Sequence, residues 1–77
     1  MEMELTMPKL SPKMEKGILC AWMKAPGDHF EQGEPIYEVE TEKVVSMVEA
    51  PVSGILKELL VEEGDEVDVG APLAVIQ

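Results

Sequence analysis

Gly17-Ile18-Leu19 recurs 37 residues further along the chain as Gly54-Ile55-Leu56. The same offset relates four more pairs of identical residues: Gly27 with Gly64, Asp28 with Asp65, Gly33 with Gly70, and Pro35 with Pro72. Seven of 24 aligned positions are therefore identical, and the glycines are in register. Composition alone does not explain this agreement, so the sequence indicates one structural unit that is present twice.

The repeated glycines predict turns, because glycine adopts the positive φ angles of tight turns without steric cost. Gly27 and Gly64 each precede an aspartate, and Gly33 and Gly70 each follow a short polar stretch. Each half is therefore expected to fold as strand, turn, short strand, turn and strand. Short strands at even spacing are typical of a sandwich or barrel. We predict an all-β fold, a flattened barrel or sandwich of two antiparallel sheets with pseudo-two-fold symmetry.

The apolar residues of the repeat predict the core. Four repeat-related pairs are expected to be largely buried: Trp22 with Leu59, Phe30 with Val67, Ile36 with Leu73, and Val39 with Ile76. Six prolines and six glycines disfavour helix in almost every window, and the most helix-compatible stretch is 57–63. A chain of 77 residues is near the lower limit for a self-sufficient core, and we expect one domain that spans residues 1–77.

The charge of the chain limits its partners. Sixteen acidic residues stand against six lysines and no arginine, which gives a net charge of −10. Such a surface repels phosphate backbones and anionic lipids, so we expect no nucleic acid and no membrane as a partner; a basic protein surface is the better candidate. Cys20 is the only cysteine, which excludes an internal disulfide and suits a reducing compartment rather than secretion. A single cysteine and a single histidine cannot build a structural metal site.

Residues 36–48 run from the end of the first copy toward the second and predict a β-hairpin with Glu42-Lys43 at its tip. The first strand of this hairpin alternates acidic and apolar residues around Val39, as a half-buried strand requires. The second strand, residues 44–48, does not alternate, so the pattern does not assign its faces.

Lys43 is the one candidate for chemistry in the chain. The sequence has no glycine-rich phosphate loop and no serine or cysteine paired with a base, and the acidic stretch 62–68 fits a solvated turn better than a cation site. Lys43 is either an ordinary exposed lysine or a modified one. Its neighbours Glu40 and Glu42 favour the charged ammonium, which does not suit a Schiff-base or general-base lysine. They are compatible with a lysine that another enzyme acylates from an activated donor.

These residues resemble the lipoyl domains of dihydrolipoamide acyltransferases (E2) in 2-oxo acid dehydrogenase complexes, members of the biotinyl/lipoyl-attachment family. Residues 7–14, Met-Pro-Lys-Leu-Ser-Pro-Lys-Met, are similar to the family's opening M-P-x-L-S-P-T-M. Residues 40–43, Glu-Thr-Glu-Lys, are similar to its E-T-D-K lipoylation motif, and residues 49–54 follow as in the family. The resemblance covers essentially the whole chain. It departs at Glu42 for aspartate, Lys13 for threonine and Val44 for alanine.

The resemblance implies that Lys43 carries lipoate through an amide, as N6-lipoyllysine. It also implies that the lipoate-attaching enzyme recognises Glu40, Thr41, Glu42 and Gly54. The domain would contain no catalytic residue and no metal, because the chemistry belongs to the cofactor.

The implied partners are three enzymes of one complex. A thiamine-diphosphate decarboxylase (E1) reductively acylates the lipoyl group, the E2 catalytic core passes the acyl group to coenzyme A, and dihydrolipoamide dehydrogenase (E3) reoxidises the dithiol. The Leu10-Ser11-Pro12 opening favours a pyruvate-type complex. The bacterial cytoplasm or the mitochondrial matrix is the expected compartment.

Two other functions remain open. A biotinyl carrier has a similar fold and shares the E-A-P-x-x-G stretch, but its lysine is flanked by methionines, whereas Lys43 has Glu42 and Val44 as neighbours. An unmodified barrel-sandwich domain with a structural role is the second alternative. A gain in mass after incubation with lipoate distinguishes a carrier from such a domain.

Overall fold

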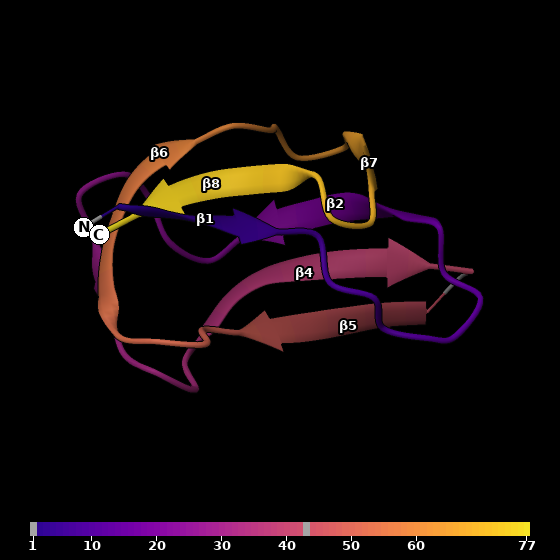
Figure 1. Cartoon of the computed structure of the whole chain (residues 1–77), viewed down its shortest axis with the longest axis horizontal. Helices are drawn as coiled ribbons and strands as arrows, with labels where there is room; N and C mark the ends of the chain where they lie inside the picture. Colours follow the sequence, from indigo (N-terminus) through magenta and orange to yellow (C-terminus); the bar gives the residue numbers. More distant parts are fainter. Residues whose placement is uncertain (1, 43) are drawn as a thin grey trace.

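The computed structural model describes residues 2–42 and 44–77 (Figure 1). These residues form eight strands and no helix: β1 (Met3–Thr6), β2 (Lys16–Trp22), β3 (His29–Phe30), β4 (Pro35–Thr41), β5 (Val44–Glu49), β6 (Gly54–Leu59), β7 (Glu66–Asp68) and β8 (Pro72–Ile76). Within these two ranges, accordingly, there is no helix with the length and apolarity needed to cross a membrane.

The strands form two four-stranded sheets, and every pairing is antiparallel. One sheet has the order β5-β4-β2-β7 and the other has the order β1-β8-β6-β3. An offset of 37 residues carries β2 onto β6, β3 onto β7 and β4 onto β8, while β5 and β1 occupy the equivalent outer edges. The all-β fold with two sheets and pseudo-two-fold symmetry is therefore confirmed. Each half contributes its short strand to the sheet built mainly by the other half.

Equivalent hydrogen bonds hold the two halves together. The Gly27 amide donates to the Leu56 carbonyl at 2.7 Å, and the Gly64 amide donates to the Leu19 carbonyl at 2.7 Å. In return, the Leu56 amide donates to the Asp28 backbone carbonyl and the Leu19 amide donates to the Asp65 backbone carbonyl, both at 2.9 Å. Backbone groups of each half are therefore hydrogen-bonded to backbone groups of the other half.

The four turn glycines have left-handed backbone conformations. Their φ angles are 96° at Gly27, 88° at Gly33, 97° at Gly64 and 88° at Gly70. A Cβ atom added at any of the four would meet nothing within 4 Å. The backbone angle, and not crowding, therefore selects glycine at these turns, as the repeat predicts.

Six of the eight expected core residues are buried, and two are not. Phe30, Ile36, Val39, Val67, Leu73 and Ile76 are all at most 6% exposed. Trp22 and Leu59 are only half-buried, so the prediction is wrong for this pair. They are the last residues of β2 and β6, where the chain leaves the sandwich and the cover over the core ends. Met7 and Met14 also belong to the core although they lie outside the repeat.

Candidate functional site

The predicted hairpin is present. Strands β4 and β5 pair antiparallel, with Thr41 opposite Val44 at the last paired position. Only Glu42 and Lys43 connect these two residues, so the turn is a tight two-residue loop at one end of the molecule (Figure 1). Lys43 itself lies outside the described residues.

Glu42 adopts an unusual backbone conformation at this turn. Its φ angle is 45°, and it is the only non-glycine with positive φ among residues 2–42 and 44–77. Two-residue hairpin loops favour positive φ, because the primed turns match the twist of the paired strands. A residue with a Cβ atom is strained there by about 1–2 kcal/mol. The closure of the hairpin therefore forces a glutamate into a conformation that its side chain disfavours.

Glu40, Thr41 and Glu42 lie together beside a hollow of about 290 Å³. The other wall of this hollow includes Lys13, from the segment before β2, and Lys16, the first residue of β2. The Lys16 Nζ pairs with Glu66 Oε1 at 3.3 Å, and both side chains are more than half exposed. The surface beside the turn therefore carries charges of both signs and is open to solvent. Three of the four predicted recognition residues are brought together here.

Gly54, the fourth predicted recognition residue, lies elsewhere. It begins β6, and a Cβ atom there would approach the Gln77 carbonyl oxygen to 2.5 Å and Phe30 Cζ to 3.4 Å. The molecule is 32 Å long, and Figure 1 shows the C-terminus and the β4–β5 turn at opposite ends of the long axis. The contacts of Gly54 therefore account for the glycine by close packing against the C-terminal backbone.

An apolar surface flanks the turn, and sequence patterning did not assign it. Val44, Val45 and Met47 on β5 are 59%, 53% and 53% exposed. Strand β5 is the outer strand of its sheet, and along it Ser46 and Val48 are half-buried while Val45 and Met47 are exposed. Exposure therefore alternates along the strand, but apolar residues stand on both faces, so the alternation does not appear in the sequence.

The described residues contain no group of three or more histidine, cysteine, aspartate or glutamate side chains that could hold a metal ion. Burial, together with Glu40 and Glu38, raises the pKa of the Cys20 thiol, which is the opposite of thiol activation.

A family model described as "Biotin-requiring enzyme", covering biotin and lipoyl attachment, matches residues 3–76. The chain belongs to the biotinyl/lipoyl-attachment family. Within the family it is a lipoyl domain, because it resembles a solved lipoyl domain over the length of both chains. That structure is the lipoyl domain of the 2-oxoglutarate dehydrogenase complex of Azotobacter vinelandii, with a TM-score of 0.78 and 31% identity, covering 96% of this chain and 94% of the other.

Curated relatives place similar lipoyl domains in E2 chains. This domain is 42% identical over 71 residues to the dihydrolipoyllysine-residue acetyltransferase component of the pyruvate dehydrogenase complex of Corynebacterium glutamicum, over 92% of this chain and 10% of that protein. It is 41% identical over 73 residues to the dihydrolipoyllysine-residue succinyltransferase component of the 2-oxoglutarate dehydrogenase complex of Bacillus subtilis, over 95% and 18%. The resemblance to E2 lipoyl domains is thus confirmed.

The relatives do not narrow the parent chain or its 2-oxo acid to a single kind of complex. The lipoyl domain is also 44% identical over 77 residues to the pyruvate dehydrogenase E1 component subunit beta of Rhizobium meliloti, over 99% of this chain and 17% of that protein. The chain spans a fifth or less of the length of these three relatives. They belong to both pyruvate and 2-oxoglutarate complexes, so the expected pyruvate type stays a prediction.

Proposed function

We propose that this lipoyl domain carries lipoate on the Nζ atom of Lys43 and belongs to the E2 chain of a 2-oxo acid dehydrogenase complex. The observation that carries the proposal is the two-residue closure of the β4–β5 hairpin at the Glu-Thr-Glu-Lys motif. Such a loop places its residues at the end of the hairpin, beyond the last paired residues Thr41 and Val44.

The residues around the turn fit the proposed group. Lipoate joined through an amide adds an apolar chain that ends in a dithiolane, and the exposed side chains of Val44, Val45 and Met47 offer an apolar surface without enclosing it. When bound, the group supplies acyl and electron transport through its two sulfur atoms. The domain supplies a rigid base, and its own residues perform none of the transfer steps.

Attachment requires a second enzyme in this proposal. That enzyme joins the lipoate carboxylate to the AMP part of ATP and releases pyrophosphate. The ammonium of Lys43 loses a proton to solvent or to the enzyme, its neutral Nζ attacks the acyl carbonyl, and AMP leaves as the amide forms. The acidic neighbours Glu40 and Glu42 give Lys43 no advantage as a nucleophile. We infer that the attaching enzyme selects Lys43 by its position in the turn.

The proposed partners are E1, the E2 catalytic core and E3, besides the lipoate-attaching enzyme. Tethering the acyl group to a domain of the complex raises its effective concentration at each active site. We propose pyruvate as the 2-oxo acid on the basis of the Leu10-Ser11-Pro12 opening. The test is reductive acylation of the lipoylated domain by a pyruvate-specific E1 and, separately, by a 2-oxoglutarate-specific E1. Faster acylation by the second enzyme would contradict the pyruvate assignment.

Biotin is the competing cofactor, since the family model that matches is described by biotin-requiring enzymes. The experiment that decides is intact mass after two parallel incubations with ATP, one with lipoate and a lipoate ligase and one with biotin and a biotin ligase. We expect one lipoyl increment in the first incubation and none in the second. A biotinyl increment would identify a biotin carrier, and no increment in either would favour an unmodified structural domain.

We further propose a reducing compartment, either the bacterial cytoplasm or the mitochondrial matrix. The support is that Cys20, half-buried on β2, is the only cysteine of the chain. Rapid alkylation of the protein in intact cells measures the redox state of this thiol. Cys20 should be trapped as a free thiol, and recovery in a mixed disulfide would oppose the proposal.

A further inference from the structure

A groove with an apolar floor and an acidic rim lies away from the Glu42-Lys43 turn. It has a volume of about 680 Å³, and seven residues line it: Trp22, Leu59, Leu60, Val61, Glu62, Glu63 and Asp65. Leu60 is 40% exposed, and the other three apolar residues are half-buried. All three acidic residues are exposed, and the lining contains no basic residue. The segment between β6 and β7, at the top of Figure 1, supplies five of the seven lining residues.

Hydrogen bonds hold this groove in shape. The Trp22 amide donates to Glu63 Oε2 at 2.9 Å, and the Trp22 indole Nε1–H donates to the Val61 carbonyl at 3.2 Å. The Glu62 amide donates to Asp65 Oδ2 at 2.8 Å. Trp22 also packs against Tyr37, with ring centroids 5.4 Å apart. The rim and the floor are therefore organised before anything binds, which lowers the entropic cost of binding.

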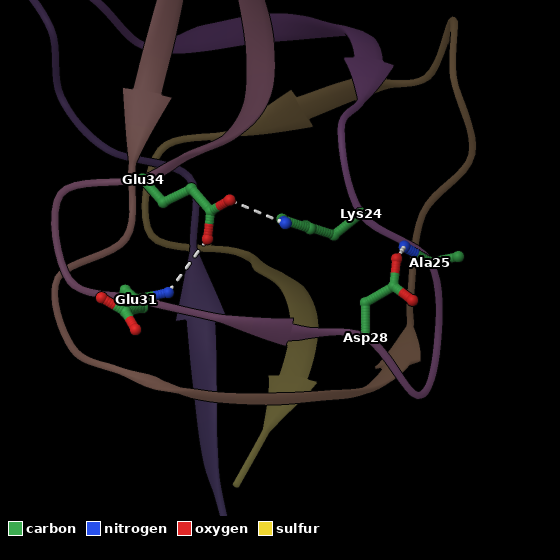
Figure 2. A network of polar contacts seen from close by, with 5 residues as sticks. All are labelled: Lys24, Ala25, Asp28, Glu31 and Glu34. Carbon is green, nitrogen blue, oxygen red and sulfur yellow. Dashed lines mark hydrogen bonds and ion pairs between the residues drawn. The ribbon is translucent and has the colours of Figure 1, made fainter.

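The internal repeat provides a comparison for this turn within the same chain. Figure 2 shows the equivalent turn of the first half, where Asp28 Oδ2 accepts a hydrogen bond from the Ala25 amide at 2.9 Å. Asp65 plays the same part in the second half. The turn therefore needs its aspartate and its glycine. It does not need Glu62 and Glu63, because Ala25 and Pro26 stand at the equivalent positions.

The charges of the two turns also differ. In the first half, Lys24 Nζ pairs with Glu34 Oε2 at 2.7 Å, so the local charge is partly neutralised (Figure 2). The position equivalent to Lys24 is Val61, and the one equivalent to Glu34 is Ala71. The two ion pairs found among the described residues do not involve Glu62, Glu63 or Asp65. The second turn therefore presents three carboxylates beside exposed apolar surface without an intramolecular cation.

We propose that this groove docks a basic segment of a partner protein, with an aliphatic side chain of the segment against Trp22 and Leu60 and its lysines or arginines on Glu62 and Glu63. Charge complementarity selects this occupant, since the carboxylates repel an acidic segment and a neutral one leaves them unused. Trp22 is paired with Tyr37, four residues before the end of β4. At about 3.3 Å per strand residue, the groove lies roughly 13 Å from the turn. A docked segment leaves the turn accessible.

The test uses the unmodified chain and three synthetic peptides. The probe is Lys-Leu-Lys-Leu-Lys-Leu-Lys; one control replaces each leucine by serine, and the other replaces each lysine by glutamate. Trp22 is the only tryptophan, so its fluorescence reports binding at the floor. Backbone amide shifts locate the contact on the molecule. We expect the Lys-Leu peptide to change Trp22 emission, the Lys-Ser peptide to bind at least threefold more weakly, and the Glu-Leu peptide not to bind.

A pair of variants separates the rim from the net charge. Glu62→Gln/Glu63→Gln keeps the side-chain shape and the oxygen that accepts from Trp22, and removes two charges from the rim. Glu2→Gln/Glu31→Gln removes two charges from exposed positions outside the groove. Affinity for the Lys-Leu peptide should fall about three- to tenfold in the first variant, as expected for two exposed ion pairs. It should change less than twofold in the second.

Three results would overturn the proposal. Equal losses of affinity in the two variants would mean that the peptide responds to net charge alone. Amide shifts centred on other strands would place the binding elsewhere. Absence of binding by the Lys-Leu peptide, while circular dichroism shows the fold intact, would exclude this occupant. None of these results depends on lipoylation, so they test the groove independently of the proposed carrier function.

Discussion

Glu42 occupies a backbone conformation that favours glycine, asparagine or aspartate, and this chain has a glutamate there. The left-handed φ of 45° costs a residue with a Cβ atom about 1–2 kcal/mol. Aspartate, the usual residue of the family motif, tolerates this region better because its short side chain bonds to the local backbone. The hairpin pairing from Thr41–Val44 onward compensates for the strain.

Replacement of Glu42 by asparagine should therefore stabilise the domain. We expect the free energy of unfolding to rise by up to about 1 kcal/mol, because asparagine enters the left-handed region more readily. The measurement is urea denaturation followed by circular dichroism. Glu31→Asn is the control, since Glu31 is not among the positive-φ residues and should show no gain. A loss of stability in Glu42→Asn would show that the Glu42 side chain contributes more than the strain costs.

Gly54 is constrained by packing rather than by its backbone angle. A Cβ atom would lie 2.5 Å from the Gln77 carbonyl oxygen, and this backbone atom cannot rotate away as a flexible side chain could. Gly54→Ala should lower the free energy of unfolding by about 1–3 kcal/mol, as overpacking does. The same urea titration measures it. An unchanged midpoint would mean that the C-terminal backbone, which Ile55 and Gln77 join by two hydrogen bonds, shifts at little cost.

At the scale of single elements, β4 contains the one tyrosine of the chain. Tyr37 is 3% exposed, and burial raises the pKa of its phenol from 10.0 to about 12. Because the neutral form is favoured in the folded state, the resulting stabilisation is fully present below pH 10 and is lost as the pH rises from 10 to 12. Its size is on the order of 2–3 kcal/mol at most. Strand β4 is thus sensitive to strong alkali.

The domain should accordingly become less stable between pH 10 and pH 12. Tyrosinate absorbance should appear near pH 12 or together with unfolding, and not near pH 10 as in a free phenol. Tyr37→Phe is the matched control and should remove this part of the pH dependence, leaving the contribution of Cys20, whose thiol pKa burial also raises. Titration of Tyr37 near pH 10 in the folded protein would contradict its burial.

Sequence reasoning predicted the strands of the repeat and the hairpin that includes β5, and it missed β1. The glycines and the hairpin were predictable, because turn chemistry and alternation are local properties. The pairing of β1 with β8 was not, because β1 and β5 are equivalent in space but not at the offset of 37 residues. Half-exposure of Trp22 was also missed, since a repeat shows which residues correspond and not where the sheet stops covering them.

At the scale of the whole molecule, the two halves are interlocked. Strand β3 belongs to the sheet of the second half, and β7 belongs to the sheet of the first. Neither half can therefore satisfy its own backbone hydrogen bonds alone, and we expect the domain to unfold as one unit. The Glu42-Lys43 turn lies outside these shared contacts. Lys43→Ala should leave the free energy of unfolding, measured by urea denaturation, within about 0.5 kcal/mol of the parent chain, because surface substitutions contribute little to stability.

The location of lipoate on the chain tests the central claim most directly. After incubation with lipoate, ATP and a lipoate ligase, peptide mass mapping should find lipoate on Lys43 and on none of the other five lysines: Lys9, Lys13, Lys16, Lys24 and Lys57. Exchange of Glu42 with Lys43 keeps the net charge and moves the lysine by one register position, so it should abolish or sharply reduce modification. Lipoate on another lysine, or on the displaced lysine at parental levels, would show that the attaching enzyme does not select position in the hairpin turn.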